Sequence, residues 1–271
     1  MKTFKLMMLT ALIAITSFSL TSCLNDNSDP SNTTLGTIAA VSYNMGYLTF
    51  TNGSLTYIPS PSSVATLEAK GAQFDKYGVV YITYTSNDTY EAGKTKYNIE
   101  LTGVVNLDNK VDILNDEATL NDSINNPKME PIIELQNWST SGTSQYMVIM
   151  DNDHVLVYAN YFLNKNAHKI TLKYCPDQTT SGSDGINLYL CNNGEGDKST
   201  AYTSSAILQA NGASYASLCY RAFNISVPLL DYKHKTGKST VKINIIAHQN
   251  TTDVSMSGSE EKTYSYDYTI N

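Results

Sequence analysis

The sequence predicts an all-β protein in which a small OB-type barrel precedes an antiparallel β-sandwich. From residue 36 onward, short apolar runs alternate with polar residues at period two, as strands with one buried face do. Turn signals separate these runs about every ten residues, a spacing typical of sandwiches and barrels. The 20 tyrosines favour pleated surfaces. No apolar stripe at helical spacing runs for three full turns, so we expect few helices.

Residues 1–22 have the order of a lipoprotein signal peptide. A cationic start is followed by an almost wholly apolar run and then by small residues up to Cys23. That order is typical of secretion signals, and the run is shorter than the about 20 apolar residues that a membrane-spanning helix needs. Leu20-Thr21-Ser22-Cys23 resembles the lipobox of bacterial lipoproteins, whose cysteine is acylated. We expect lipid on Cys23; the alternative is an ordinary cleaved signal beside a chance cysteine.

Residues 23–35 are interpreted as the lipidated cysteine and a flexible tether, because they are polar and have almost nothing to bury. Asp26 and Asp29 lie close behind the cysteine, and this acidic stretch resembles the export signal of surface lipoproteins in Bacteroidetes. We therefore expect a cell-envelope protein held to the outer membrane by lipid, facing either the periplasm or the exterior.

The charge of the chain argues against nucleic acid as a partner. The formal net charge is −7, and it becomes −9 once residues 1–22 are removed, because they hold two lysines and no acid. Affinity for phosphates depends largely on Lys and Arg, and the chain has a single arginine, Arg221. We expect contact with the membrane through the lipid, together with a protein or glycan partner in the envelope.

Residues 36–107 predict the barrel. Three strand-like runs are followed by an irregular or helical link around Pro61 and then by two more runs, which is the order of a five-stranded OB-type barrel. Asn52-Gly53 is a strong signal for a tight hairpin. A simple meander is the alternative. The five runs cover residues 38–43, 47–51, 55–58, 79–85 and 97–105.

The remainder predicts a connector and the sandwich. Residues 108–130 are acidic and rich in amides, with few consecutive apolar residues, so we interpret them as the connector between domains. Residues 131–271 then form the sandwich. Its strand candidates are residues 132–138, 145–150, 154–163, 168–175, 186–191, 216–227, 241–248 and 262–270.

These features together resemble the NigD-like lipoproteins of Bacteroidetes, over nearly the whole mature chain. The resemblance implies an N-terminal OB domain and a C-terminal β-sandwich, and an association with bacteriocin operons, but no biochemical activity. The stretch from Gly71 to Phe74 lacks the basic residue that the pattern leads us to expect. The motifs that carry the resemblance are Phe50-x-x-Gly53, Lys70-Gly71, Val80-Tyr81-Ile82-Thr83-Tyr84, the run 122–127 leading to Trp138, Ala222-Phe223-Asn224-Ile225, and Lys262-Thr263-Tyr264-Ser265-Tyr266.

Several motifs that suggest chemistry are better explained as turns. Gly237-Lys238-Ser239-Thr240 resembles the end of a phosphate-binding loop, but the earlier glycine is missing and a strand-like run follows. Ser181-Gly182-Ser183-Asp184-Gly185 lacks the first glycine of a nucleophile elbow. The stretch 151–154 (DNDH) is a good hairpin tip centred on Asn152-Asp153, and 192–197 is interpreted as a loop. We predict no metal site and no cofactor.

The candidate site residues belong to three groups. Tyr43, Tyr47 and Tyr57 fall on the first three strands of the barrel, where OB folds often bind oligosaccharides; packing of half-buried tyrosines is the alternative. Asp122-Ser123-Ile124 resembles the acceptor triplet for O-glycosylation in Bacteroidetes, which makes Ser123 a candidate for modification. Cys175 and Cys191 would face each other in a hairpin and are candidates for a disulfide, against the alternative of buried free thiols.

The sequence favours a non-enzymatic envelope protein that acts as a binding or interaction module. The four histidines belong to no catalytic signature, and no cysteine or serine lies in a recognisable triad. The first alternative is an enzyme acting on extracellular glycans, since a pair of catalytic carboxylates is not visible in a sequence. The second is a fimbrial-type structural subunit, although the chain has no arginine before Arg221 at which such precursors could be cleaved.

Overall fold

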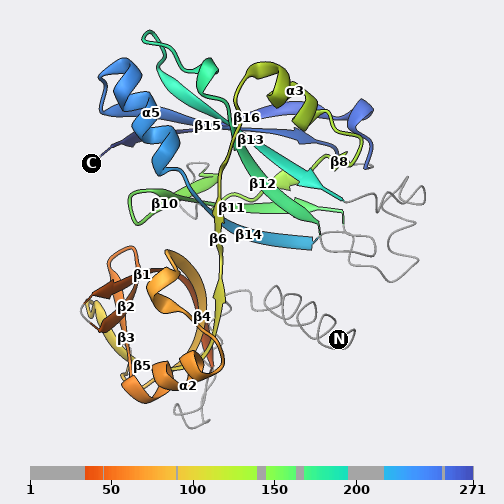
Figure 1. Ribbon diagram of the computed structural model, residues 1–271. Helices are drawn as coiled ribbons and strands as arrows, with labels where there is room; N and C mark the ends of the chain where they lie inside the picture. Colours follow the sequence, from red (N-terminus) through yellow and green to blue (C-terminus); the bar gives the residue numbers. More distant parts are fainter. Residues whose placement is uncertain are drawn as a thin grey trace, which may run out of the picture.

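The computed structural model shows a barrel and a sandwich joined end to end, with strands as the main element of both (Figure 1). No helix in the described part of the chain is both long enough and apolar enough to cross a membrane. The described residues are 34–44, 46–89, 91–138, 145–162, 168–194, 217–251 and 254–270.

Five strands close into the predicted OB-type barrel. The strand order is β1-β2-β3-β5-β4, and β4 pairs with β1 to complete the ring. The β3–β5 pair is parallel and the other neighbours are antiparallel. Asn52 pairs with Leu55, so the two-residue turn between β2 and β3 is Gly53-Ser54, one residue later than predicted. Gly53 has a positive φ of 57°, as tight hairpins require. The strands are β1 (Leu35–Asn44), β2 (Tyr47–Asn52), β3 (Leu55–Pro59), β4 (Val79–Ser86) and β5 (Lys96–Asn106).

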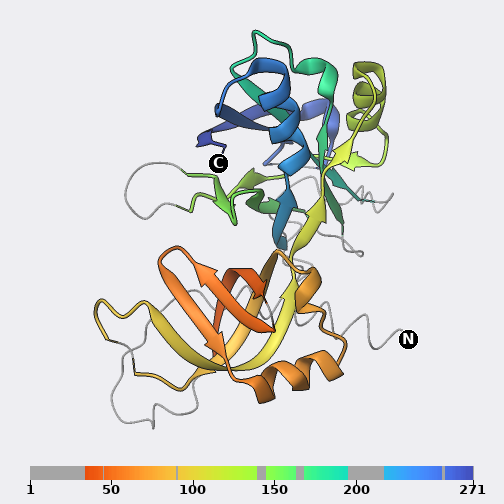
Figure 2. The same cartoon turned by 60° about the vertical axis from the view of Figure 1, so that its left-hand side comes forward.

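A short helix covers one end of the barrel (Figure 2). This helix, α2 (Pro61–Ala69), begins where the Ser60 hydroxyl accepts a hydrogen bond from the Ser63 amide (3.2 Å), with proline at the first helical position. Its Leu67 is buried in the barrel core beside Phe50, Phe74 and Ile82. A short 3-10 turn, η2 (Phe74–Lys76), then leads to β4. The irregular link predicted around Pro61 therefore closes the barrel.

The sandwich consists of two sheets that enclose the larger core. One sheet has the order β10-β11-β14-β6, with β9 beside β11, and faces the barrel; the other has the order β16-β15-β13-β12-β7, with β8 beside β13. The strands of the first sheet are β6 (Asp108–Lys110), β9 (Glu134–Leu135), β10 (Met147–Met150), β11 (His154–Tyr161) and β14 (Ser217–Asn224). Those of the second are β7 (Asp112–Ile113), β8 (Met129–Glu130), β12 (Lys169–Tyr174), β13 (Gly185–Asn193), β15 (Thr240–Gln249) and β16 (Glu260–Thr269).

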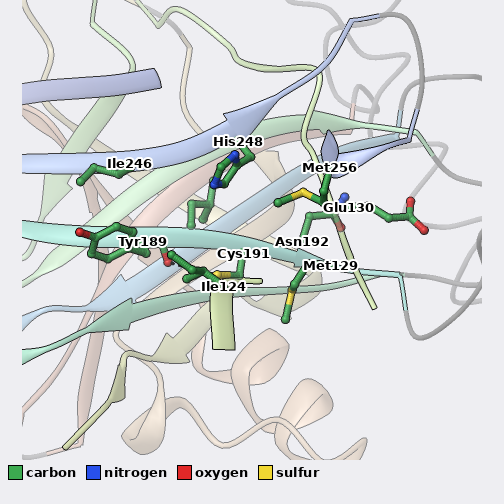
Figure 3. A pocket seen from close by; sticks show the side chains of 10 residues that line it. Ile124, Met129, Glu130, Tyr189, Cys191, Asn192, Ile246, His248 and Met256 are labelled. Carbon is green, nitrogen blue, oxygen red and sulfur yellow. Dashed lines mark hydrogen bonds between the residues drawn. The ribbon is translucent and has the colours of Figure 1, made fainter. Parts of the chain in front are cut away.

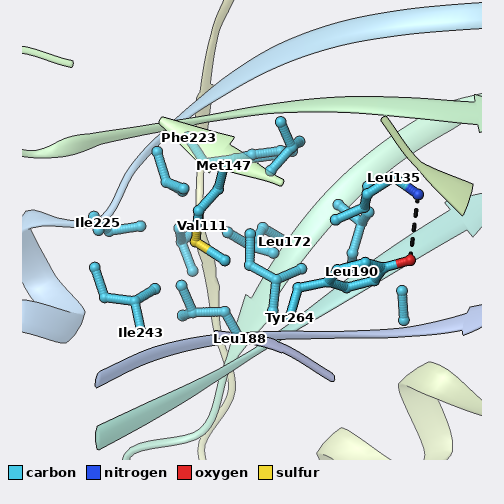
Figure 4. Close-up of a cluster of buried hydrophobic side chains, with 14 of the residues drawn as sticks. Val111, Leu135, Met147, Leu172, Leu188, Leu190, Phe223, Ile225, Ile243 and Tyr264 are labelled. Carbon is cyan, nitrogen blue, oxygen red and sulfur yellow. Dashed lines mark hydrogen bonds between the residues drawn. The ribbon is translucent and has the colours of Figure 1, made fainter. Parts of the chain in front are cut away.

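Apolar side chains from both sheets fill the space between them (Figure 4). Met147 and Phe223 come from one sheet, and Leu172, Leu188 and Ile243 come from the other. At the edge of this core the Tyr264 hydroxyl accepts a hydrogen bond from the Leu135 amide (3.4 Å). The alternation of apolar and polar residues in the sequence therefore reflects side chains that point from both sheets into the core of the sandwich.

The sheets of the sandwich are mixed, whereas the sequence predicted antiparallel ones. The central pair β13–β15 is parallel, as are the short pairs β12–β7 and β14–β6. Parallel neighbours need a long crossover, and between β13 and β15 the chain passes through β14 in the other sheet and then through α5 (Ser226–Thr236). The prediction that residues 216–227 form one strand is wrong at its end, because α5 begins at Ser226.

The interpretation of residues 108–130 as a connector needs correction. This segment contributes β6, β7 and β8 to the two sheets, and a helix, α3 (Glu117–Ile124), lies between them. The Asp116 carboxylate caps α3 by accepting a hydrogen bond from the Thr119 amide (2.7 Å). Leu120 is the buried residue of this helix. The polar composition gave no sign of these elements, because each of them buries at most two side chains. The remaining short turns are η3 (Pro176–Gln178) and η4 (Met256–Gly258).

The barrel and the sandwich share a third, smaller core. Ala40 and Val79 of the barrel pack with Met150, Leu156 and Ala222 of the facing sheet. Leu107, between β5 and β6, also belongs to this cluster; its amide donates to the Val79 carbonyl (3.0 Å) and its carbonyl accepts from the Ala222 amide (3.0 Å). The backbone hydrogen bonding of the barrel therefore continues directly into the sandwich.

Candidate functional site at the domain junction

A cleft of about 740 Å³ lies beside the shared core, between the barrel and the sandwich. Its size is in the range of about 300 to 1,000 Å³ that small-molecule sites in proteins have. The barrel contributes the segment before β4, β6 crosses the cleft, and the sandwich contributes His154 and the start of α5. The lining residues are Asp75, Lys76, Tyr77, Gly78, Asn106, Asp108, Asn109, Lys110, Val111, Ile113, His154, Asn224, Val227 and Pro228.

Asp108 attaches the first residue of β6 to the barrel. Its carboxylate accepts hydrogen bonds from two consecutive backbone amides, those of Gly78 (2.5 Å) and Val79 (2.7 Å). Hydrogen bonds to a charged acceptor are stronger than those between neutral groups. Val79 is fully buried, so its amide has no access to water as a substitute. One side chain thus fixes where the chain leaves the barrel.

His154, the first residue of β11, links three elements at the same place. Its Nδ1 lies 2.6 Å from the Asp153 carboxylate, and its Nε2 lies 3.8 Å from the Asp108 carboxylate and 3.4 Å from the Asn224 amide nitrogen. The residue is only 7% exposed. A Cβ at Gly78 would come within 2.6 Å of the His154 ring, so only glycine fits at that position. The junction therefore depends on close packing as well as on charge.

The turn before His154 brings together three groups that could ligate a metal ion. One atom each from Asp151, Asp153 and His154 lies within 4.8 Å of the others. Burial, then repulsion from Asp153, raises the pKa of the Asp151 carboxyl. The turn spans three residues, 151–153, between the paired Met150 and His154, rather than the predicted two-residue tip at Asn152-Asp153. Asp151 and Asn152 have positive φ. Calcium needs six to eight oxygen ligands, and these three groups on one turn supply too few. We assign no metal to it.

The three candidate tyrosines of the barrel do not form one surface. Tyr43 is 44% exposed and Tyr47 is 81% exposed, on adjacent strands. Tyr57 is 7% exposed and packs against the rings of Tyr84 and Tyr97 in the barrel core, with ring centroids 5.3 and 6.3 Å apart. Burial, and next the proximity of Tyr57, raises the pKa of Tyr84. Tyr47 pairs with Asn44, so Tyr47 and Tyr43 point to opposite faces of the β1–β2 pair. The prediction that the three tyrosines share one binding face is therefore wrong.

The predicted disulfide between Cys175 and Cys191 is also wrong. The register pairs Thr171 with Cys191 and Tyr174 with Leu188, so Cys175 lies four residues beyond the position opposite Cys191. At about 3.3 Å per strand residue this offset far exceeds the reach of a disulfide. Cys175, Cys191 and Cys219 are buried free thiols. Burial raises the pKa of the Cys191 thiol to about 12.

The remaining sequence candidates lie elsewhere. Ser123 is half-buried on α3, rather than in an exposed connector. Its glycosylation stays a prediction. Cys23 lies outside the described residues. Lys238 belongs to the glycine–lysine motif after α5. It donates to the Asp184 carboxylate (2.9 Å) and to the Ser183 carbonyl (2.9 Å), so this turn is hydrogen-bonded to the turn that contains Ser183 and Asp184. Asn192 and Asn193 end β13 and Gly194 follows it, while 195–197 lie outside the described residues.

A small cavity on the outer face of the second sheet is shown in Figure 3. Its volume is about 20 Å³, and Met129, Glu130, Cys191 and His248 are among the residues around it. A space of that size holds about one water molecule. It is therefore too small for a substrate, and the junction cleft remains the better candidate.

No sequence signal identified the junction cleft. Asp108, His154 and Gly78 come from three separate segments, and each has an ordinary local explanation: a polar linker, a turn and a loop. The close contact between Gly78 and the His154 ring joins segments that are far apart in the sequence, so no local pattern predicts it. The sequence predicts a turn at Asp153, but the partners of His154, Asp108 and Asn224, are distant in sequence and no local pattern joins them to it.

The chain shares its fold with solved structures of Bacteroides proteins, while its sequence matches no protein-family model and no curated protein. One similar structure is a candidate lipoprotein of Bacteroides fragilis, at 18% identity and a TM-score of 0.64, over 88% of this chain and 99% of that one. Another is a NigD-like immunity protein of Bacteroides caccae, at 13% identity and a TM-score of 0.52, over 91% and 100% of the two chains. At these identities the likeness shows the fold alone, and at that level the resemblance read from the sequence is confirmed.

Proposed function

We propose that the chain is a non-enzymatic, lipid-anchored binding module of the cell envelope, and that it holds a protein partner at the junction cleft. The lipobox-like residues before Cys23 support the anchor. The shared fold with a candidate lipoprotein and with a NigD-like immunity protein supports the general class, and neither neighbour is described as an enzyme. The observation that carries the proposal is the cleft itself.

Exposed apolar side chains border this cleft, which favours a protein as the partner. Val227, on α5, is 55% exposed, and Ile113, on β7, is 41% exposed; both line the cleft. Leu230 is 63% exposed and lies three residues after Val227, on the same face of α5. Apolar residues grouped at a concave surface are typical of sites where proteins dock.

The walls of the cleft are fixed before any partner arrives. Asp108 holds β6 to the barrel, and His154 packs against Gly78 from the side of the sandwich. A preorganised site loses less conformational entropy on binding. The mature net charge of −9 favours a cationic partner through long-range attraction. We therefore infer a basic partner that inserts apolar side chains beside α5.

Site-directed photo-cross-linking in the native envelope tests the cleft. A photoreactive residue at Val227 is expected to give a discrete adduct with a protein, because this position lines the cleft and is exposed. The matched control carries the same residue at Tyr47, which is more exposed but lies on the barrel, outside the lining of the cleft. An adduct from Tyr47 alone, or from neither position, would contradict a partner at the cleft.

Two further measurements test the other parts of the proposal. Metabolic labelling with palmitate is expected for the natural chain and absent in Cys23→Ser, since the thiol is the predicted attachment point. Labelling that persists in the variant would disprove the anchor. Purified mature chain is expected to show no turnover of envelope glycans or peptides; appreciable hydrolysis would favour the alternative of a glycan-active enzyme.

A further inference from the structure

A second cavity opens between the edges of the two sheets of the sandwich. Its volume is about 490 Å³, and it shares Asn109 and Lys110 with the junction cleft. One wall comes from β6 and β14 of the first sheet, and the other from β7 and the start of β12 in the second sheet. In each sheet these strands are neighbours at one end of the strand order. The cavity is therefore the open side of the sandwich.

The charges around this cavity are opposite to those of the protein as a whole. Lys110, Lys169 and Arg221 line it, and among the described residues none of them forms an ion pair. The one lining carboxylate belongs to Asp112, which already lies 3.8 Å from the ammonium of Lys173. The cationic side chains around this cavity outnumber its carboxylate, although the mature net charge of the chain is −9, and this excess favours an anionic ligand.

Arg221 is the only arginine of the chain, and it lies at the inner side of this cavity. On β14 the residues two positions away, Cys219 and Phe223, belong to the sandwich core, so strand alternation directs Arg221 to the same side. The residue is half-buried. The one hydrogen bond that its guanidinium makes to a described residue runs to the Tyr220 carbonyl (2.9 Å).

A half-buried guanidinium without a carboxylate partner is costly unless a ligand compensates it. Guanidinium groups stay charged in proteins, and an unpaired charge loses solvation when it is covered. The donors that Arg221 does not use remain available as a planar fork, whose geometry matches the two oxygens of a carboxylate. Asn109 and Thr171 add neutral polar groups to the lining, although the Asn109 side-chain nitrogen already donates to the Leu107 carbonyl (2.8 Å).

We propose that this cavity binds a sugar acid, with the carboxylate of the saccharide on Arg221 and with Lys110 and Lys169 flanking it. The volume suits one or two sugar rings, since small-molecule sites measure about 300 to 1,000 Å³. The proposal goes beyond the protein-binding role of the junction cleft, because it rests on different residues and concerns a small anionic ligand. A sugar acid here leaves Val227 and the rim of the cleft uncovered.

Isothermal titration calorimetry on the complete lipidated chain in neutral detergent tests this proposal with four probes. Glucuronic and galacturonic acid are the charged probes, glucose is the uncharged analogue, and inorganic phosphate is the competing oxyanion. We expect at least one sugar acid to bind, and glucose to bind at least about tenfold more weakly because it has no carboxylate. Affinity is expected to fall as salt screens the cations. Phosphate binding as tightly as the sugar acids would overturn the assignment to a saccharide.

Variants separate the site from the general charge of the protein. Arg221→Gln is expected to weaken binding of the sugar acid at least about tenfold, and Lys169→Gln about threefold, because that side chain is exposed. Lys70→Gln, at the exposed end of α2 in the barrel, removes the same charge and is expected to leave the affinity unchanged.

Equal binding by Lys169→Gln, Lys70→Gln and the natural chain would refute the site even if Arg221→Gln failed to fold. Binding of glucose as tightly as of a sugar acid would refute it too, as would the absence of binding by all charged probes. Cross-linking from Val227 remains an independent measure, so that failure of the sugar-acid site and failure of the junction cleft are distinguishable.

Discussion

Substitution of Asp108 is predicted to weaken the junction between the barrel and the sandwich more than any change at an exposed acid. In Asp108→Ala the backbone amides of Gly78 and Val79 lose their acceptor, at present 2.5 and 2.7 Å away. Val79 is fully buried and packs in the junction core. Its amide would be left without a partner inside the protein, which is the most costly form of a lost hydrogen bond.

The expected loss can be bounded from these contacts. A hydrogen bond to a charged acceptor contributes about 1.5 to 3 kcal/mol, so loss of both is expected to reduce the free energy of unfolding by about 3 to 6 kcal/mol. This is a large part of the about 5 to 15 kcal/mol that ordinary proteins have. Asp108→Asn keeps one acceptor oxygen but places an amide group at the other backbone N–H, so we expect roughly half of the loss.

The chain contains its own reporter for this experiment. Trp138 is the single tryptophan, and its ring packs against Tyr158 and Tyr220 at the junction, with centroids 5.7 and 5.8 Å apart. Urea unfolding followed by tryptophan fluorescence therefore reports on the junction, while circular dichroism reports on all strands. If the junction of Asp108→Ala opens before the barrel and the sandwich unfold, the transition seen by fluorescence occurs at a lower urea concentration than the transition seen by circular dichroism. Such a separation shows that unfolding is not two-state.

Asp122→Ala is the matched control, because Asp122 is exposed on α3 and changes the net charge by the same amount. Its effect is expected to lie within about 0.5 kcal/mol. A loss below about 1 kcal/mol in Asp108→Ala, with the control unchanged, would mean that the two backbone amides find other acceptors. The role that we assign to Asp108 would then be refuted.

Three other predictions concern single positions. Gly78→Ala places a Cβ within 2.6 Å of the His154 ring and is expected to lower the free energy of unfolding in urea by about 1 to 3 kcal/mol. The double variant Gly78→Ala/His154→Ala should regain part of this loss, and additive losses would contradict direct contact. Burial raises the pKa of Cys191 from 9.0 to about 12, so Ellman's reagent should react with it only after unfolding. Because the folded state keeps this proton while the unfolded state releases it, the contribution to stability is lost as pH rises above 9 toward 12; rapid labelling of native protein would disprove the burial. Ser123→Ala should remove any glycan-dependent mass shift from protein isolated from its native host, and a shift that persists would exclude Ser123 as the acceptor.

The barrel could be predicted from the sequence because local signals there agree with the final fold. Alternating burial on β2 and β4 follows the apolar pattern, and Gly53 takes the positive φ that its tight turn requires. The error over Tyr57 was avoidable in principle. The turn at Gly53-Ser54 places Phe50 directly opposite Tyr57, and opposed residues share a face of the sheet. A turn one residue earlier would also keep the two on one face, so an inward Phe50 requires an inward Tyr57.

The short elements of the sandwich could not be predicted, because their partners are distant in sequence. β6 pairs with β14 over more than a hundred residues, as in the pair Ala222 and Asp108. Neither β6 nor β7 has enough residues to show a period. The helix α5 buries only Pro228, Leu229 and Tyr232, which is too few for an amphipathic stripe to appear. In both cases tertiary pairing, rather than local propensity, decides the structure.

The geometry of the junction indicates a fixed joint rather than a hinge, and this bears on how the cleft can bind. A hinge requires a few residues whose backbone is free to change. Here Leu107, the residue between the two bodies, is bound on both sides, through its amide to Val79 and through its carbonyl to Ala222. Asp108 beside it holds two more amides of the barrel. Closing the cleft around a partner would break these bonds together, so recognition must rely on a surface that is already formed.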